Sequence, residues 1–197
     1  MTVAGLILAA GSGSRLGQPK ALVEIGGERL VDRAVRVLRA GGCDPIVVVS
    51  GAAPFELDGV AVFANPDWAT GMGSSLRVGL TALADSEVPA VLVSLVDQPD
   101  IGPEVVRRVI AAFDAGATVA TATYGGKRRN PVLLARGTWA EVARLAEGDA
   151  GARPYLAAHA AEITPVECDD LGSPADIDTP EDLARARNRG PSADPGK

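Results

Sequence analysis

The chain has 197 residues, of which 47% are apolar and 22% charged, and this balance is typical of a single globular domain with a substantial buried core. Its formal net charge of −6 at pH 7 argues against nucleic acid or an anionic membrane surface as a partner. The two cysteines, Cys43 and Cys168, form neither a disulfide framework nor a metal-ligand spacing, and no apolar run approaches the length of a membrane span, so we expect a cytoplasmic protein.

Apolar runs and amphipathic segments alternate along the chain. The apolar runs predict strands over residues 3–9, 45–50, 60–64, 90–96, 118–124, 131–135 and 163–168. Helical spacing predicts helices over residues 28–40, 74–85, 103–115, 138–147 and 153–160, and Thr179 caps a last helix. Near-continuous apolar strands separated by helices are typical of a parallel sheet that is covered on both faces. We therefore predict an α/β fold, one doubly wound and mostly parallel sheet over residues 1–189, followed by a polar tail over residues 190–197.

A glycine-rich loop follows the first of these strands. The run Gly11-Ser12-Gly13-Ser14 allows the backbone to approach a ligand closely, and the cations Arg15 and Lys20 come next. Backbone N–H groups and two cations at the end of a buried strand predict a polyphosphate site. Neither standard phosphate-binding pattern is met, because Leu16 stands where the dinucleotide fingerprint needs its third glycine, and Lys20 follows a proline where the Walker loop needs a glycine.

An aspartate ends the most apolar of the predicted strands. Parallel sheets bind ligands at the carboxyl ends of their strands, and Asp97 stands at such an end. One or two carboxylates beside substrate phosphates are enough to hold Mg²⁺. A second ligand is expected from the acidic stretch near the end of the chain, from Asp178 or Asp176. The alternatives are a turn residue at Asp97 and a helix cap with first-turn acids in the acidic stretch.

Two motifs carry a family resemblance. The stretch from Leu8 to Lys20 resembles the nucleotidyltransferase signature L-x-[AG]-G-x-x-x-R-x-G-x-x-K, and the stretch from Leu95 to Pro99 resembles the segment ending in Asp-x-Pro of the MobA-like NTP transferase family. Further segments resemble the molybdenum cofactor cytidylyltransferase branch of that family: residues 65–68 with 71–77, 130–133, 148–153 and 176–182. The fold that this resemblance implies is the Rossmann-like nucleotidyltransferase fold.

The resemblance also assigns roles. It implies that Leu8, Ala9, Ala10 and Gly11 line the nucleotide, that Arg15 and Lys20 bind its phosphates, and that Asp97 holds Mg²⁺. Arg15, Lys20 and Asp97 are thus the expected catalytic residues, with Asp97 and Asp178 as metal ligands.

Two further groups of polar residues are candidates for substrate contacts. We expect Asn65, Asp67, Ser74 and Ser75 at the nucleotide, with Ser74 alternatively serving only as a helix cap. We expect Arg77, Asn130, Asp149 and Arg153 at the acceptor. The family usually has Arg-Gly-His where this chain has Arg128-Arg129-Asn130, which leaves the identity of the acceptor open. The only histidine, His159, has no histidine or cysteine at ligand spacing and is expected to be a surface or packing residue.

The activity that these expectations describe is transfer of CMP from CTP to a molybdopterin-type cofactor, with Mg²⁺ and release of pyrophosphate. The guanylyl branch usually has two glycines where this chain has Ala10-Gly11, and the extra methyl group favours a pyrimidine. The implied partners are CTP, the molybdopterin-type molecule and a molybdenum-dependent hydroxylase or dehydrogenase that receives the product. Alternatives are GTP or a sugar phosphate as substrate, a carrier of the pterin cofactor without enzymatic activity, and an NAD(P)H-dependent oxidoreductase of the nicotine-pigment type.

Overall fold

A computed structural model describes residues 2–189 of the chain. The tail expected over residues 190–197 lies outside the described residues. None of the described helices is long and apolar enough to cross a membrane.

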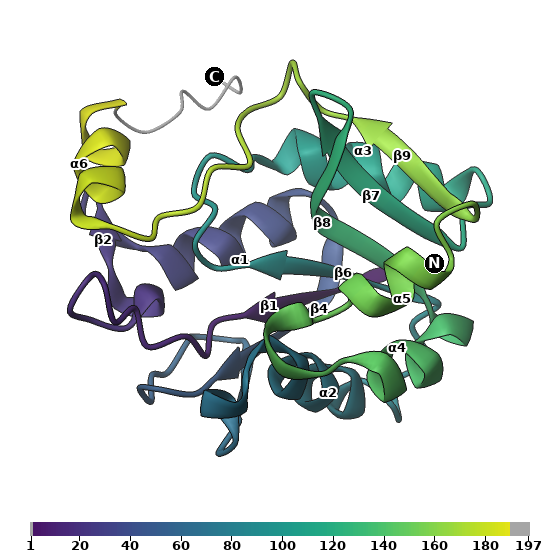
Figure 1. Cartoon of the computed structure of the whole chain (residues 1–197), viewed down its shortest axis with the longest axis horizontal. Coiled ribbons are helices and arrows are strands. Elements are labelled where there is room, and N and C mark those ends of the chain that lie inside the picture. Colours follow the sequence, from purple (N-terminus) through teal and green to yellow (C-terminus); the bar gives the residue numbers. More distant parts are fainter. Residues whose placement is uncertain (1, 190–197) are drawn as a thin grey trace.

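A seven-stranded sheet forms the centre of the molecule, in the order β5-β4-β1-β6-β8-β7-β9 (Figure 1). Every neighbouring pair is parallel except those of β8, which runs antiparallel to β6 and to β7. The mostly parallel sheet is therefore confirmed. The strands span Val3–Leu8 (β1), Cys43–Ser50 (β4), Ala61–Ala64 (β5), Ala90–Leu95 (β6), Val119–Tyr124 (β7), Lys127–Ala135 (β8) and Ile163–Glu167 (β9).

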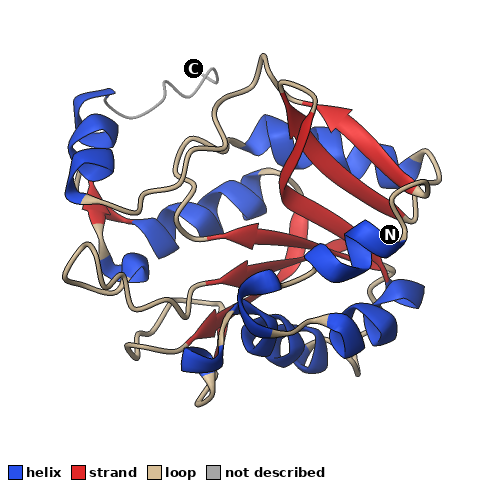
Figure 2. Cartoon of the chain, viewed as in Figure 1, coloured by secondary structure: helices blue, strands red, loops and turns tan. Residues whose placement is uncertain are grey.

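Helices cover both faces of this sheet, as Figure 2 shows. Helices α1 (Leu30–Ala40) and α3 (Pro103–Asp114) lie on one face, and α2 (Met72–Ala82), α4 (Trp139–Leu145) and α5 (Arg153–Ala158) lie on the other. Because successive strand side chains point to opposite faces, each central strand contributes to two cores. Ile7 and Leu92 pack with α1 and α3, whereas their neighbours Leu6 and Val91 pack with α2 and α4.

A small hairpin precedes α1. It pairs β2 (Glu24–Ile25) with β3 (Glu28–Arg29) around Gly26 and Gly27, which have φ angles of 62° and 83°. The prediction that a helix begins at Glu28 is therefore wrong by two residues, because this glycine turn sends the chain back as a strand. The last helix, α6 (Pro180–Arg189), lies beside the hairpin, and Arg187 donates hydrogen bonds to the carbonyl oxygen of Glu24. The end of the described chain thus returns to the segment that follows the first loop (Figure 1).

Other boundaries differ from the expected ones by a few residues. Helix α2 begins at Met72 and ends at Ala82, whereas residues 74–85 were expected. Strand β8 begins at Lys127, so part of the polar stretch expected as a loop is an exposed strand. Its register against β7 shifts beside Asn130 and Pro131, which marks a bulge that accommodates a proline without a backbone N–H group. Thr179 caps α6 as predicted, since its hydroxyl oxygen accepts a hydrogen bond from the backbone N–H of Asp182.

Candidate functional site

The segment after β1 is held between the neighbouring strands. The carbonyl oxygen of Leu8 accepts a hydrogen bond from Val96, the N–H of Ala9 donates to Val49, and the carbonyl oxygen of Ala10 accepts from Ala52. The side chains of Leu8, Ala9 and Ala10 are all buried. Gly11 is exposed, and a Cβ atom added there would meet nothing within 4 Å. The backbone therefore reaches open space at Gly11, beyond the carboxyl ends of the strands.

Gly13 fixes the shape of the following loop. It has a φ angle of 59°, and a Cβ atom there would lie 2.0 Å from the carbonyl oxygen of Gln18. Only glycine satisfies both conditions. Because the loop folds this tightly on itself, Lys20, which begins the short helix Lys20–Leu22, lies back at the carboxyl edge of the sheet.

Three predicted residues meet at this edge. The ammonium nitrogen of Lys20 donates hydrogen bonds to Oδ2 of Asp97 and to Oδ1 of Asp178, each over 2.5 Å. Lys20 and Asp97 are only 17% and 15% exposed, whereas the Asp178 side chain is 37% exposed. Arg15 lies at the rim, 71% exposed, with its Nη2 atom 4.0 Å from Oδ2 of Asp178.

The charge of Lys20 is maintained by these two carboxylates. Burial alone would lower its pKa, but the attraction of Asp97 and the hydrogen bonds to Asp178 and Asp97 outweigh burial and raise the pKa above its usual value. Lys20 is therefore a cation at neutral pH. The structure brings together Arg15, Lys20, Asp97 and Asp178, and their roles in binding phosphates and a metal ion stay predictions.

Asp176 and Asp178 have different partners, although the sequence left them as alternatives. Asp178 contacts Lys20, whereas Oδ1 of Asp176 accepts a hydrogen bond of 2.8 Å from the side-chain amide of Gln98. Loss of solvent around the Asp176 carboxyl, together with the nearby carboxylate of Asp97, raises the pKa of Asp176. Sequence reasoning missed Gln98, which it treated only as part of a turn, because nothing in the sequence relates it to a partner 78 positions away.

Asn65, Ser74 and Ser75 form a buried network with one another. The Asn65 side-chain amide donates to the hydroxyl oxygens of Ser74 and Ser75 over 2.8 and 3.0 Å, and its Oδ1 accepts from the N–H of Asp67. These side chains thus fix the turn between β5 and α2. Asp67 itself is exposed. Contact between a nucleotide and these four residues, Asn65, Asp67, Ser74 and Ser75, stays a prediction.

The beginning of α2 packs directly against the segment that precedes α5. A Cβ atom on Gly71 would lie 2.3 Å from the carbonyl carbon of Gly148, and one on Gly73 would lie 2.8 Å from that of Ala146. The guanidinium of Arg77 donates to the carbonyl oxygen of Ala146. Residues 71–77 and 146–149 are therefore packed directly against each other.

The other expected acceptor residues lie in two places. Arg153 donates hydrogen bonds to the carbonyl oxygens of Asp149 (2.6 Å) and Ala150 (3.2 Å), so it stabilises the turn in which Asp149 stands. Asn130 lies half-buried in the bulge of β8. No hydrogen bond or ion pair between described residues joins Asn130 to the Lys20 cluster. Their contacts with an acceptor remain predictions.

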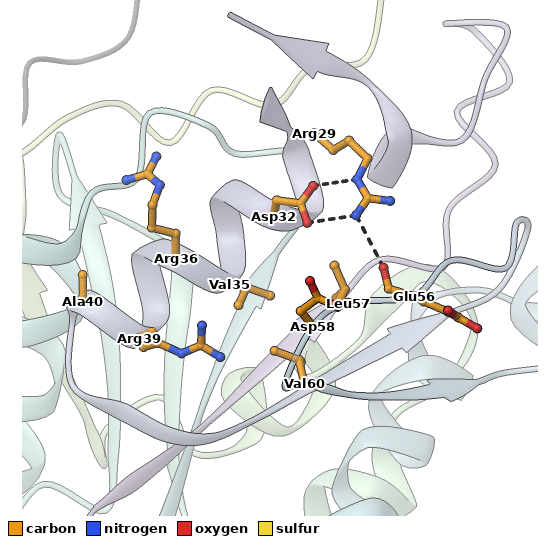
Figure 3. A pocket seen from close by; sticks show the side chains of 10 residues that line it. All are labelled: Arg29, Asp32, Val35, Arg36, Arg39, Ala40, Glu56, Leu57, Asp58 and Val60. Carbon is orange, nitrogen blue, oxygen red and sulfur yellow. Dashed lines mark hydrogen bonds and ion pairs between the residues drawn. The ribbon is translucent and has the colours of Figure 1, made fainter. Parts of the chain in front are cut away.

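A hollow of about 600 Å³ lies elsewhere, between α1 and the loop before β5 (Figure 3). Arg29 and Asp32 form a bidentate pair at one end of it, and Arg29 also donates to the carbonyl oxygen of Glu56. Val35, Leu57 and Val60 give the hollow an apolar lining. It contains none of the residues that the sequence assigned to catalysis or binding.

The donor atoms at the Lys20 cluster fit a hard divalent cation. Within residues 2–189, no group of three or more histidine, cysteine, aspartate or glutamate side chains is arranged to hold a metal ion. Asp97 and Asp178 nevertheless place carboxylate oxygens from two distant segments around one positive centre, the ammonium of Lys20. Mg²⁺ commonly takes one or two carboxylates and completes its shell with water and substrate phosphates.

Comparisons with known proteins add a family to this geometry. Residues 5–163 match the model of the MobA-like NTP transferase domain. The chain is 34% identical to a nicotine blue oxidoreductase of Paenarthrobacter nicotinovorans, over 93% of this chain and 95% of that protein. It is 30% identical to a molybdenum cofactor guanylyltransferase of Rhodobacter capsulatus, over 96% of this chain and 97% of that protein.

A solved structure extends the likeness to the three-dimensional arrangement of most of the chain. The crystal structure of Rv0371C from Mycobacterium tuberculosis H37Rv in complex with manganese is similar with a TM-score of 0.79 at 26% identity, covering 95% of this chain and 99% of that one. The names of the two relatives give different activities, so the family match identifies the kind of domain but not its substrates.

Proposed function

Because the chain belongs to the MobA-like NTP transferase family, we propose that it transfers CMP from CTP to a molybdopterin-type cofactor and releases pyrophosphate. The observation that carries this proposal is the bridge from the Lys20 ammonium to Asp97 and Asp178, at the mouth of a glycine-rich loop. A cation beside paired carboxylates at the end of a parallel strand suits a triphosphate bound with a divalent metal.

The reaction needs charge neutralisation more than proton transfer. A phosphate oxygen of the acceptor attacks the α-phosphorus of CTP, the bond from that phosphorus to the β-bridging oxygen breaks, and the electron pair leaves with pyrophosphate. The acceptor phosphate is already ionised, so no general base is required. Lys20 and Arg15 offset negative charge on the β- and γ-phosphates, and backbone N–H groups beyond Ala10 orient the triphosphate.

Asp97 and Asp178 are the residues that would hold Mg²⁺. When bound, the ion supplies positive charge to the phosphate oxygens of the substrate. Lys20 would then exchange its carboxylate partners for the triphosphate. The manganese complex of a structural neighbour supports a divalent ion in this fold.

CTP is proposed over GTP because of Ala10. A Cβ atom added at Gly51 would lie 2.7 Å from the Ala10 methyl group and 2.6 Å from Cβ of Trp68, so these three residues form a tightly packed wall beside the first loop. The methyl group narrows the space at this wall and favours the smaller base. The related guanylyltransferase makes GTP the first competitor to test.

The proposal is tested by measuring pyrophosphate release from CTP, GTP, ATP and UTP with molybdopterin-type acceptor, each with Mg²⁺ and with EDTA. We expect Mg²⁺-dependent release with CTP well above the other nucleotides, and a cytidylylated pterin as product. Pyrophosphate release with GTP alone would show that GTP, not CTP, is the nucleotide substrate. In a parallel assay with a sugar phosphate as acceptor, release only with that acceptor would show that the pterin is not the acceptor. A cytidylylated pterin product would be the cofactor that a molybdenum-dependent hydroxylase or dehydrogenase receives as the partner enzyme.

An oxidoreductase is the second candidate, because a relative at 34% identity carries that name. A thermal-shift panel with CTP, GTP, NADPH and NADH, each with and without Mg²⁺, separates the two, since a ligand that binds only the folded chain raises the midpoint. A metal-dependent shift with CTP supports nucleotidyl transfer. A metal-independent shift with NADPH or NADH alone supports the oxidoreductase.

A further inference from the structure

The segment that carries Asp178 to the cation site has little regular structure of its own. Residues 171–178, here called the strap, connect the region after β9 to α6 without forming a helix or strand. Asp178 is nevertheless held within 2.5 Å of the Lys20 ammonium. The position of Asp178 must therefore come from contacts between the strap and other parts of the chain.

The turn after β6 supplies three of those contacts, and the first turn of α6 supplies another, since Oδ2 of Asp182 accepts a hydrogen bond of 3.2 Å from the backbone N–H of Asp178. The N–H of Ile177 donates a hydrogen bond of 2.9 Å to the carbonyl oxygen of Asp97. The side-chain amide of Gln98 donates to Oδ1 of Asp176 over 2.8 Å and to the carbonyl oxygen of Pro174 over 3.2 Å. These three hydrogen bonds hold the four residues that directly precede Asp178.

Gln98 itself is rigidly placed. It is only 7% exposed, and both N–H groups of its amide are used by the strap. The opposite orientation of the amide would direct its oxygen at a carboxylate and a carbonyl oxygen, two acceptors, so the observed orientation is the one that chemistry allows. Its Oε1 has no hydrogen-bond partner among the described residues.

The neutrality of Gln98 suits its place. A cation at position 98 would pair with Asp176 and would also draw Asp97 or Asp178 away from Lys20 and from a metal ion. A carboxylate would repel Asp176. An amide ties the strap down through two donors without changing the net charge of the site.

We propose that Gln98 is a positioning residue that sets the second metal ligand, Asp178, by fastening the strap to the turn after β6. The assignment of Asp178 as a metal ligand rests on the proposed function, whereas the fastening of the strap by Gln98 does not. Groups that orient metal ligands in this manner typically change metal affinity by about 10- to 100-fold when they are removed.

The fastening is tested in the protein without ligands, by hydrogen exchange of peptides that cover residues 172–178. Gln98→Leu keeps the size of the side chain and removes both donors, so we expect faster exchange in the strap and unchanged exchange in β1 and β6. Ser173→Ala is the matched control, because it changes the strap and leaves the Gln98 contacts in place. Unchanged exchange in Gln98→Leu would overturn the proposal. If this variant does not fold, Asp176→Asn, which weakens the same contact from the other side, is used with the same expectation.

The link to Asp178 is tested by titrating Mn²⁺·CTP and metal-free CTP into each variant. We expect Gln98→Leu to weaken Mn²⁺·CTP binding at least about 10-fold and to leave metal-free CTP binding unchanged. In an Asp178→Asn background, Gln98→Leu should add little, because the ligand that it positions is already gone. A full additional loss in that background would overturn the role assigned to Gln98. Failure of the wild-type chain to bind any CTP would contradict the proposed function, and the exchange experiment would still decide on the fastening.

Discussion

Lys20 and Asp178 are 158 positions apart in the chain, and the Lys20 ammonium lies 2.5 Å from Oδ1 of Asp178. This contact brings the first loop and the strap together at the carboxyl edge of the sheet. Asp97, which also accepts a hydrogen bond from Lys20, joins them from the end of β6. One positive charge thus holds two negative charges together.

Lys20→Met is expected to remove most turnover and leave the fold intact. The loss of one preorganised charge that acts on phosphate oxygens typically lowers kcat about 100-fold or more. Without the ammonium, Asp97 and Asp178 face each other with no cation between them, so the variant should also gain more thermal stability from Mg²⁺ than the wild type does. Steady-state pyrophosphate release and thermal unfolding with and without Mg²⁺ measure both effects. Arg39→Met, which removes an exposed cation at the hollow beside α1, is the control and should change neither. Near-normal turnover in Lys20→Met would remove Lys20 from the mechanism.

Ala10→Gly is expected to relax the preference for CTP. The substitution removes the buried Ala10 methyl group, which lies beside Gly51 and Trp68, and under the proposed function this leaves more room for a larger base. We expect kcat/KM for GTP to rise about 10-fold relative to that for CTP, which corresponds to about 1.4 kcal/mol of discrimination. Competition assays with both nucleotides give this ratio directly. An unchanged ratio would show that the base is selected elsewhere.

Gly13→Ala and Gly17→Ala separate backbone strain from close contact. Both glycines have left-handed φ angles, 59° and 73°, but only a Cβ atom at Gly13 would collide with the chain. We expect Gly17→Ala to cost about 1 kcal/mol of stability from its φ angle alone. Gly13→Ala should cost more and should also weaken nucleotide binding, because Gln18 and then Lys20 must move. Urea unfolding and CTP titration of the two variants measure the difference, and equal effects would contradict the loop geometry.

The sequence predicted that Lys20 and Asp97 lie at this site, but it did not decide between Asp176 and Asp178. Lys20 and Asp97 follow buried strands that turned out to be adjacent and parallel, and the carboxyl ends of such strands necessarily meet at one edge. Asp178 could not be separated from Asp176, because the choice depends on the contact between Gln98 and the strap. Such a contact leaves no periodic signal.

The sequence also could not show which contacts its polar turn residues make with one another. Asn65, Ser74 and Ser75 stand at a strand end and a helix start, where polar residues often contact ligands. In the structure they hydrogen-bond to one another in a buried turn, and their contact with a nucleotide stays a prediction. The β2–β3 hairpin was missed because its two-residue strands are too short to show alternation, although Gly26-Gly27 is a typical hairpin turn.

His159 gives a pH dependence of stability that is independent of the nucleotide site. Its ring lies 4.3 Å from that of Tyr155, its Nδ1 atom is 3.2 Å from Glu162, and its Nε2 atom is 3.4 Å from Glu141. The hydrogen bond to Glu162 and the contact with Glu141 raise the pKa of His159. A raised pKa means that the folded chain binds the proton more tightly than the unfolded chain. The stabilisation is therefore fully present below about pH 6.5, the ordinary pKa of histidine, and is lost as the pH rises through the raised value. His159→Gln should remove this decline, so urea unfolding at several pH values between about 5.5 and 8.5 should show the wild type losing its advantage over the variant at the alkaline end. A difference between the two that does not change with pH would assign His159 to packing alone.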